Sequence, residues 1–283
     1  MTLVDAVTGS FDGAASARYR EVMQSLVRHL HAFVDEVSLT EAEWTLAIDF
    51  LTRTGQISDS RRQEFVLLSD VLGVSMATVA ANAPDDPAAT ESTVLGPFFV
   101  AGAPLFDLGA DISGGAAGQP CYVDGTVRDT AGTPIAGARL EVWQSDEDGF
   151  YDVQYEGGAI ANRGHLFSDE AGGYRFWAVR PAPYPIPYDG PVGELLTAAG
   201  RGPMRPAHIH FLVSAPGYHT VTTHIFVDGG EYLHDDAVFG VKDSLIYPFT
   251  DQPPGPAPEG RQMDGPWSRV HFDIVLAGSG RNE

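Results

Sequence analysis

Cysteine, positive charge and long apolar runs are all scarce in this chain of 283 residues. The single cysteine, Cys121, excludes an internal disulfide and a zinc cluster built on cysteines. Lysine and arginine number 17 against 38 aspartates and glutamates, a formal net charge of −21, which disfavours nucleic acid and anionic membranes as main partners. The sequence shows no signal peptide and no run of about 20 apolar residues, the length that crosses a bilayer. These absences favour a cytoplasmic protein without a membrane span.

The first 90 residues carry the spacing of amphipathic helices. Apolar side chains at three- and four-residue steps form a stripe from Val22 to Val37. Thr40 with Glu43 predicts a capping box that begins a second helix, and Gly55 is expected to end it. A third helix is expected to begin at Ser60.

Beyond the linker at residues 82–89, glycine and proline become frequent and short alternating runs appear. At least seven strands are predicted, at residues 121–127, 139–143, 164–167, 174–179, 208–213, 220–227 and 270–276. Residues 169–173 predict a hairpin turn, and residues 250–266 a surface loop. The predicted fold class is α+β: a helical N-terminal domain with its linker, residues 1–90, on an antiparallel β-sandwich, residues 91–283.

The most informative motif is the pair His208 and His210. Side chains alternate along a strand, so the two imidazoles face the same side, about 6 to 7 Å apart at the backbone. Two imidazoles so placed can ligate one metal ion. By itself the motif is more often a pair of ordinary strand histidines than a metal site.

Tyrosines supply the missing context. Tyr151 follows the strand that ends at Trp143, and Tyr184 lies in an extended, proline-rich loop, with Tyr155 and Tyr188 as competing candidates. A phenol, with a pKa near 10, is a poor ligand for zinc but a good one for a hard trivalent ion, which stabilises the phenolate. Two phenolates and two imidazoles would leave Fe(III) with one positive charge and an open position for an anionic chelating substrate.

These motifs resemble those of the intradiol ring-cleaving dioxygenases, non-haem Fe(III) enzymes. The segments that match in order and spacing are Gly149-Phe150-Tyr151, Pro183-Tyr184, Arg205 to His210, and Thr90 to Phe98. The resemblance implies one Fe(III) per subunit and O2 as co-substrate. It also implies four ligands to that iron, which are Tyr151, Tyr184, His208 and His210.

The resemblance also implies roles for individual residues. Tyr184 and His208 would be the axial ligands, and Tyr184 would leave the metal and take up a substrate proton. Arg205 would stabilise negative charge that develops on the substrate. We interpret His224 as a catalytic residue beside the iron and not as a further ligand.

Within the family, residues 184–193 and 236–242 and His224 look most like the branch that cleaves hydroxyquinol. The substrate would be benzene-1,2,4-triol and the product maleylacetate, with Asp70 as a candidate partner of the third hydroxyl. The residues that the resemblance places around the substrate are Leu67, Asp70, Val94, Leu95, Gly96, Pro97, Phe98, Ile186, Pro187, Arg205 and Val238. Catechol or a substituted catechol is the alternative substrate.

A non-catalytic metal- or ligand-binding β-sandwich is the more distant alternative, and two tyrosines at ligand positions disfavour copper or zinc. The apolar stripe from Val22 to Val37 needs a partner. Relatives of this type pair through their N-terminal helices and often hold a phospholipid there. The resemblance therefore implies a homodimer, with a phospholipid as a further ligand at its interface.

Overall fold

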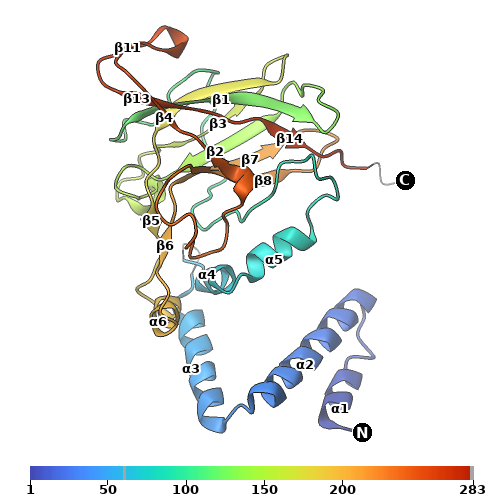
Figure 1. Cartoon of the computed structure of the whole chain (residues 1–283). Helices are drawn as coiled ribbons and strands as arrows, with labels where there is room; N and C mark the ends of the chain where they lie inside the picture. Colours follow the sequence, from blue (N-terminus) through green and yellow to red (C-terminus); the bar gives the residue numbers. More distant parts are fainter. Residues whose placement is uncertain (60–61, 281–283) are drawn as a thin grey trace. The chain divides into compact units, whose positions relative to one another are not determined.

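The computed structural model describes residues 1–59 and 62–280. The chain forms two compact units, Met1–Gln56 and Ile57–Glu283, and each is described by itself. Helices α4 and α5 therefore belong to the same unit as the sheets (Figure 1). The domain boundary after residue 90 stays a prediction.

The first unit consists of helices α1 (Leu3–Gly9), α2 (Ala17–Val37) and most of α3 (Glu41–Ile57), with α1 packed against α2. The capping box at Thr40 is confirmed, because its main-chain N–H donates to Glu43 Oε2 over 2.9 Å and its hydroxyl accepts from the Glu43 N–H. The expected end at Gly55 is wrong, since α3 continues to Ile57. Helix α1 was not anticipated.

Apolar side chains lie on the surface of this first unit. Among its described residues only Val27 and Thr54 are buried. The side chains of Leu30, Phe33 and Trp44 are each more than half exposed. So many exposed apolar side chains in one unit are typical of a protein that buries them against a partner.

The described part of the second unit contains three α-helices, α4 (Glu64–Val71), α5 (Val74–Ala81) and α6 (Pro191–Ala198), besides short 3-10 turns. Ser60, the expected start of the third helix, lies outside the described residues, and α4 begins after Gln63. The fully buried Glu64 carboxylate accepts from the Val192 N–H over 3.1 Å and so ties α4 to the start of α6. In the described part of the chain, no single helix is long and apolar enough to span a membrane; α4 and α5 pass that test only as a pair bent by 77°.

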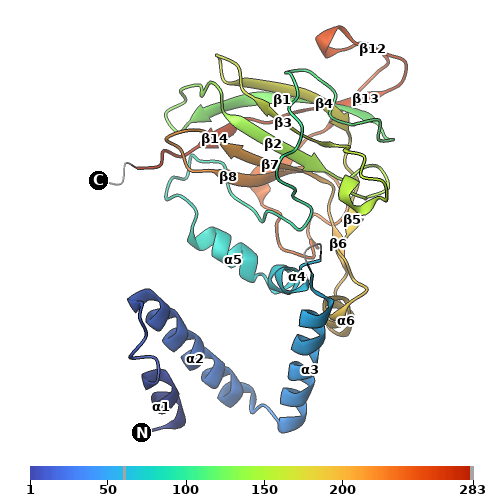
Figure 2. The same cartoon turned by 180° about the vertical axis from the view of Figure 1, so that it is seen from behind.

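Two five-stranded sheets form the sandwich, and the views from opposite sides agree on the two layers (Figures 1 and 2). The first sheet contains β1 (Pro120–Asp129), β4 (Gly173–Val179), β10 (Thr250–Gln252), β13 (Trp267–His271) and β14 (Ile274–Leu276). The second contains β3 (Arg163–Phe167), β2 (Arg139–Gln144), β7 (His208–Ser214), β8 (Val221–Val227) and β9 (Ile246–Tyr247) in that order. Two short ribbons complete the unit, β5 (Tyr184–Pro185) with β6 (Met204–Arg205) and β11 (Gly255–Pro256) with β12 (Gln262–Met263).

The α+β class and the sandwich are confirmed, but three details of the prediction are wrong. The loop at residues 250–266 contains β10, β11 and β12. Residues 270–276 form two strands, because the Asp273 carboxylate accepts the Thr126 N–H over 2.9 Å and interrupts the ladder. The sandwich is mainly antiparallel, yet β13 and β14 both run parallel to β1, and β9 runs parallel to β8.

The predicted hairpin at residues 169–173 is also wrong, although its turn chemistry is right. The Asp169 carboxylate accepts main-chain N–H groups of Ala171 and Gly173, and Gly172 has a positive φ of 75°. However, β3 pairs with β2 in one sheet and β4 pairs with β1 in the other. The turn therefore crosses between the layers.

The main core lies between the two sheets and fixes which face of β7 carries the histidines. Ile209, Phe211 and Val213 belong to that core. Because side chains alternate along a strand, His208 and His210 project from the opposite, outer face of the sheet. Both are nonetheless buried, because loops cover that face.

Candidate metal centre

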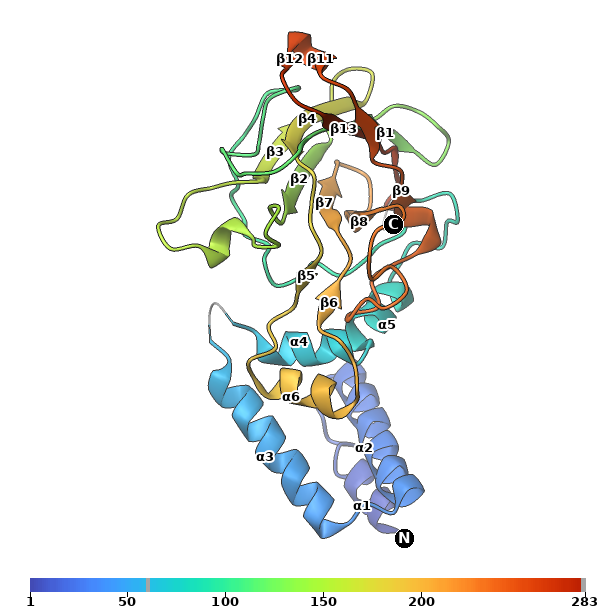
Figure 3. The same cartoon turned by 60° about the vertical axis from the view of Figure 1, so that its left-hand side comes forward.

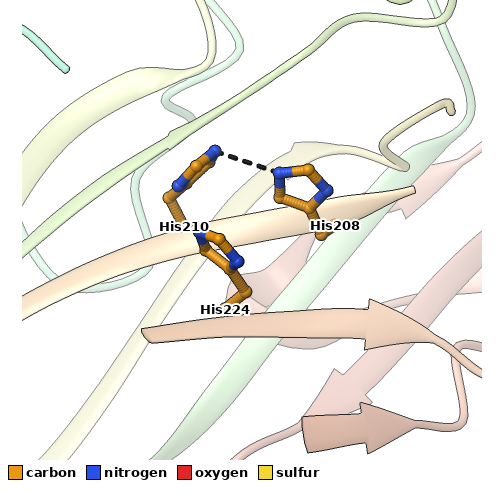
Figure 4. A group of neighbouring side chains, drawn as sticks. All are labelled: His208, His210 and His224. Atoms are coloured by element: carbon orange, nitrogen blue, oxygen red, sulfur yellow. Dashed lines mark hydrogen bonds between the residues drawn. The ribbon is translucent and has the colours of Figure 1, made fainter. Parts of the chain in front are cut away.

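Strand register places three rings side by side across the outer face of the second sheet. Trp143 on β2 lies opposite His210 on β7, and His210 lies opposite His224 on β8. The indole stacks on the His210 ring with centroids 4.6 Å apart and planes 16° apart, and the His224 ring lies 4.1 Å from that of His210. The rings of His208, His210 and His224 converge, as Figure 4 shows.

The β5–β6 ribbon delivers a tyrosine and an arginine to the same place (Figure 3). Tyr184 pairs with Arg205 in this ribbon, and β7 begins three residues after Arg205. The ring of Tyr184 therefore lies 5.5 Å from that of His208.

Tyr151 arrives from the loop after β2. Gly149 has a φ of 81°, and a Cβ there would lie 3.0 Å from the Pro183 carbonyl oxygen and from Tyr184 Cβ. Only glycine fits this close approach without strain. Gly149 thus lets the loop that carries Tyr151 pack against the segment that carries Tyr184.

Four donor atoms from these segments share one small space. The hydroxyl oxygen of Tyr151 lies 2.9 Å from His210 Nε2 and 3.2 Å from the hydroxyl oxygen of Tyr184. His208 Nε2 lies 3.0 Å from His210 Nε2. All four residues are at most 2% exposed. The competing candidates Tyr155 and Tyr188 are 49% and 61% exposed and lie outside this group.

The protonation states of the histidines suit metal binding. His208 Nδ1 lies 2.7 Å from the Pro206 carbonyl, which can only accept, so the proton sits on Nδ1 and the Nε2 lone pair faces the cluster. Burial, with the nearby Arg205 charge, lowers the pKa of His208 to about 3. Burial also lowers the pKa of His210 well below its ordinary value, while burial and the neighbouring Tyr184 raise that of Tyr151 well above. A cation bound here would stabilise the phenolate forms of the tyrosines and so offset the free energy needed to ionise them.

His224 lies beside His208 and His210 but forms no hydrogen bond with either of them. One ring nitrogen from each of the three histidines lies within 4.8 Å of the others, and this is the one such group found in the described part of the chain. Among the described residues, neither ring nitrogen of His224 has a hydrogen-bond partner of normal geometry, although its ring is fully buried. Burial, together with the neighbouring His208, keeps its pKa well below the ordinary value.

Arg205 is the positive charge of the site. Its Nη1 lies 3.4 Å from the Tyr184 hydroxyl oxygen and 3.3 Å from His208 Nε2. The Asp236 carboxylate pairs with it at 3.0 Å from Nε. Burial alone would lower the pKa of Arg205, but Asp236, together with the nearby phenols of Tyr184 and Tyr151, outweighs burial and raises that pKa, so the guanidinium stays charged.

The expected substrate residues do not all lie together. Leu67, Val94, Ile186 and Val238 pack in one buried apolar cluster. Asp70 is 4% exposed, and burial raises its pKa.

Gly96 and Phe98 border the donor group. A Cβ at Gly96 would lie 3.1 Å from His210 Cε1, and the Phe98 ring stacks on Tyr151 at 4.5 Å. Pro187 is half-buried, whereas Leu95 and Pro97 are exposed and belong to neither group.

Sequence reasoning missed three features that hold the site together. They are the pairing of Asp236 with Arg205, the stacking of Trp143 on His210, and a buried ion pair between Arg163 and Asp152. Arg163 also donates to the Phe98 carbonyl over 2.9 Å. Strand register and loop packing create all three, and no local sequence signal marks them.

Known proteins resemble this chain over nearly all of its length. Two family models match: "Catechol dioxygenase N terminus" over residues 16–90 and "Dioxygenase" over residues 94–278. The chain is 62% identical to the hydroxyquinol 1,2-dioxygenase of Rhodococcus opacus, covering 97% of this chain and 93% of that protein. It is 60% identical to that of Nocardioides simplex, covering 97% and 94%. The solved hydroxyquinol 1,2-dioxygenase of Pseudomonas putida DLL-E4 superposes with a TM-score of 0.90 at 44% identity, covering 97% of each chain.

Proposed function

This chain belongs to the intradiol ring-cleaving dioxygenases, and on that premise we propose that it cleaves hydroxyquinol, benzene-1,2,4-triol, with O2 to give maleylacetate. The observation that carries the proposal is the convergence of two phenol oxygens and two imidazole nitrogens beside one buried guanidinium. Relatives that are 60% and 62% identical bear the name hydroxyquinol 1,2-dioxygenase, which favours the triol over catechol.

The donor set fits Fe(III). Two phenolates and two neutral imidazoles suit a hard trivalent ion, and the depressed pKa values of His208 and His210 keep both imidazoles neutral, each with one N–H, at neutral pH. We propose Tyr151, Tyr184, His208 and His210 as its ligands, with one ion per subunit. Bound there, Fe(III) would supply a Lewis acid that the diol can chelate through its two oxygens, which would make the ring reactive toward O2.

Tyr184 and Arg205 would handle the proton and the charge. The Tyr184 hydroxyl oxygen is the proposed acceptor of one substrate hydroxyl proton as the diol binds. Arg205 Nη1, 3.4 Å from that oxygen, would hydrogen-bond to negative charge on the reacting substrate. His224, with no hydrogen-bond partner on either ring nitrogen, is the proposed polar neighbour of the reacting oxygens.

The apolar cluster of Leu67, Val94, Ile186 and Val238 would hold the ring of the substrate. Asp70 on α4 is the proposed partner of the third hydroxyl. A pocket that hydrogen-bonds a hydroxyl rejects the analogue without it, because a buried polar group is then left unpaired.

Enzyme-dependent O2 uptake on iron-loaded protein, with the triol against catechol, tests the proposal. The spontaneous oxidation of the triol is measured without enzyme and subtracted. We expect a higher kcat/KM for the triol, and a loss of that preference in Asp70→Asn. A preference for catechol in the unaltered enzyme would overturn the substrate assignment while leaving the metal site untouched.

The first unit supports a homodimer. The domain roles expected from the sequence are pairing for residues 1–90 and catalysis for residues 91–283. We propose them with one change, because α4 belongs to the unit of the sheets and its Leu67 and Asp70 would serve the substrate pocket.

The apolar side chains of the first unit, Leu30 and Phe33 among them, are exposed. A phospholipid with its acyl chains on this surface is part of the proposal, as is the cytoplasmic location that the sequence favours. Leu30→Lys should shift the protein to a monomer in light scattering after gel filtration, while the neighbouring His29→Lys should not; a dimeric Leu30→Lys would argue against this face.

A further inference from the structure

We propose that Asp236 is the positioning residue that aims Arg205 at the reacting atoms, an inference that rests on the proposed function of the site. Asp236 makes no hydrogen bond to the four donor atoms in the described structure. Its role would be to fix the plane of the guanidinium so that one nitrogen, Nη1, faces the phenol of Tyr184.

The ion pair with Asp236 engages two of the three guanidinium nitrogens of Arg205 and leaves the third to face the metal-ligand group. Arg205 Nε donates to Asp236 Oδ1 over 3.0 Å, and Nη2 donates to Oδ2 over 3.3 Å. The side chains are 2% and 3% exposed. A carboxylate that accepts from two nitrogens along one edge of a planar guanidinium sets its orientation. The remaining nitrogen, Nη1, then lies within 3.4 Å of both the Tyr184 hydroxyl oxygen and His208 Nε2.

The Asp236 carboxylate is itself held by the segment that follows it. Gly240 N–H donates to Oδ2 over 2.8 Å, and Val238 N–H donates to Oδ1 over 3.3 Å. Ala237 N–H donates to the Met204 carbonyl, next to Arg205 in β6. The carboxylate cannot rotate without breaking these bonds, so the aim of Arg205 is built into the fold.

The same segment carries backbone strain. Phe239 adopts a φ of 57°, a left-handed conformation that is costly for an aromatic residue. Arg201 packs over its ring at 4.7 Å and donates to the Ala237 carbonyl over 2.9 Å. Strain of this kind persists only where the surroundings fix the segment, as they do here.

A substitution at Gly240 would change the orientation of the Arg205 guanidinium without removing a charge. A Cβ at this position would lie 2.9 Å from Arg205 Nη2 and 3.1 Å from Asp236 Oδ2. The backbone of Gly240 is not left-handed, so alanine is compatible with its backbone. Its methyl group would instead push on the guanidinium. Val238, two residues earlier, lies in the apolar cluster, so the segment also joins Arg205 to the wall of the proposed pocket.

The test compares Gly240→Ala and Asp236→Asn with the control Gly265→Ala, whose added Cβ meets no atom within 4 Å. Iron is loaded alone, and three quantities are measured on each variant. These are the metal content, the visible phenolate-to-iron absorption of the resting protein, and kcat and KM with the triol. The absorption needs no substrate and so tests the inference even if the proposed substrate is wrong.

We expect Gly240→Ala to bind a full complement of iron, to shift the absorption maximum as Nη1 moves from the Tyr184 oxygen, and to lose about 10- to 100-fold in kcat. Asp236→Asn should lose about 100-fold or more. Gly265→Ala should match the unaltered enzyme in all three.

An unshifted absorption with kcat within threefold of the unaltered enzyme in Gly240→Ala would overturn the proposal. So would a Gly240→Ala variant whose losses equal its loss of iron, because Asp236 and Gly240 would then serve only stability. If Asp236→Asn fails to fold, Gly240→Ala decides. If the unaltered enzyme turns over no triol, the substrate assignment fails and the absorption shift alone decides the role of Asp236.

Discussion

The two halves of the candidate metal centre are held by different forces. Tyr184 and His208 lie beside a buried guanidinium and its carboxylate, whereas Tyr151 and His210 lie between aromatic rings. The first half is organised by charge, and the second by stacking.

The charged half is where we expect a proton to move. The Nη1 of Arg205 reaches both Tyr184 and His208, and His208 Nδ1 donates to the Pro206 carbonyl. Each polar atom there has a directional partner. A phenol beside a fixed positive charge can lose and regain its proton without leaving an unpaired buried charge.

The stacked half has few directional partners beyond the phenol–imidazole contact itself. His210 Nδ1 has no hydrogen-bond partner, and Trp143 and Phe98 fix the rings by packing. Its ion pair, Arg163 with Asp152, lies one residue beyond Tyr151 and acts on the loop backbone. We infer that this half holds a permanent ligand pair, while the charged half contains the ligand that exchanges.

The largest expected effect comes from removing each phenol oxygen in turn, which tests whether Tyr184 and Tyr151 have different roles. Tyr184→Phe removes both a proposed ligand and a base, so we expect a loss of about 10³- to 10⁴-fold in kcat, with part of the visible absorption. Tyr151→Phe should lose absorption to a similar extent but less turnover. The control is Tyr174→Phe, which removes a buried hydroxyl outside the metal centre. Tyr174 lies on β4 in the first sheet, and its hydroxyl donates to the Phe272 carbonyl between β13 and β14. Full activity in Tyr184→Phe would refute the ligand assignment.

The next effect concerns stability in the stacked half. Arg163→Met leaves Asp152 buried without its partner, which should lower the free energy of unfolding by about 3–5 kcal/mol. The double variant Arg163→Met/Asp152→Leu should recover most of that loss. Urea denaturation of the metal-free chain measures both, and a single variant as stable as the unaltered protein would show that the pair does not hold the loop.

A smaller effect is expected when the charge of Arg205 is kept but its geometry is changed. Arg205→Lys keeps the charge and a partner for Asp236 but loses the two-point fork. We expect kcat to fall about 100-fold, with iron content and melting temperature nearly unchanged. A kcat within threefold would mean that charge alone suffices and that the aim of the guanidinium is unimportant.

The smallest effect concerns stacking on His210. Trp143→Phe should shift the visible absorption and lower kcat by less than about tenfold, because a smaller ring still packs there. Trp177→Phe is the matched control, since Trp177 is also a fully buried indole with an unpaired Nε1 but lies in the other sheet. Both variants should lose about 1–2 kcal/mol of stability; equal absorption shifts in the two would show that Trp143 has no special role.

The sequence alone predicted the α+β class, the sandwich and most strands. Local patterns suffice for these features, since alternation of apolar residues and turn chemistry act over a few residues. The pairing of the strands could not be predicted from the sequence, as the segment 164–179 shows. Its turn forms as expected, yet its two strands join opposite sheets because packing between layers decides the partner.

The site divides in the same way. His208 and His210 could be placed together from sequence because strand alternation is local, and the tyrosines followed from the family resemblance. Asp236, Trp143 and the Arg163–Asp152 pair could not, because each acts through contacts between segments distant in the chain. The sequence thus determined which chemical groups are available, and the tertiary structure decided which of them meet. The reason is that hydrogen bonds and stacking act over a few ångströms, and only folding sets distances on that scale between remote residues.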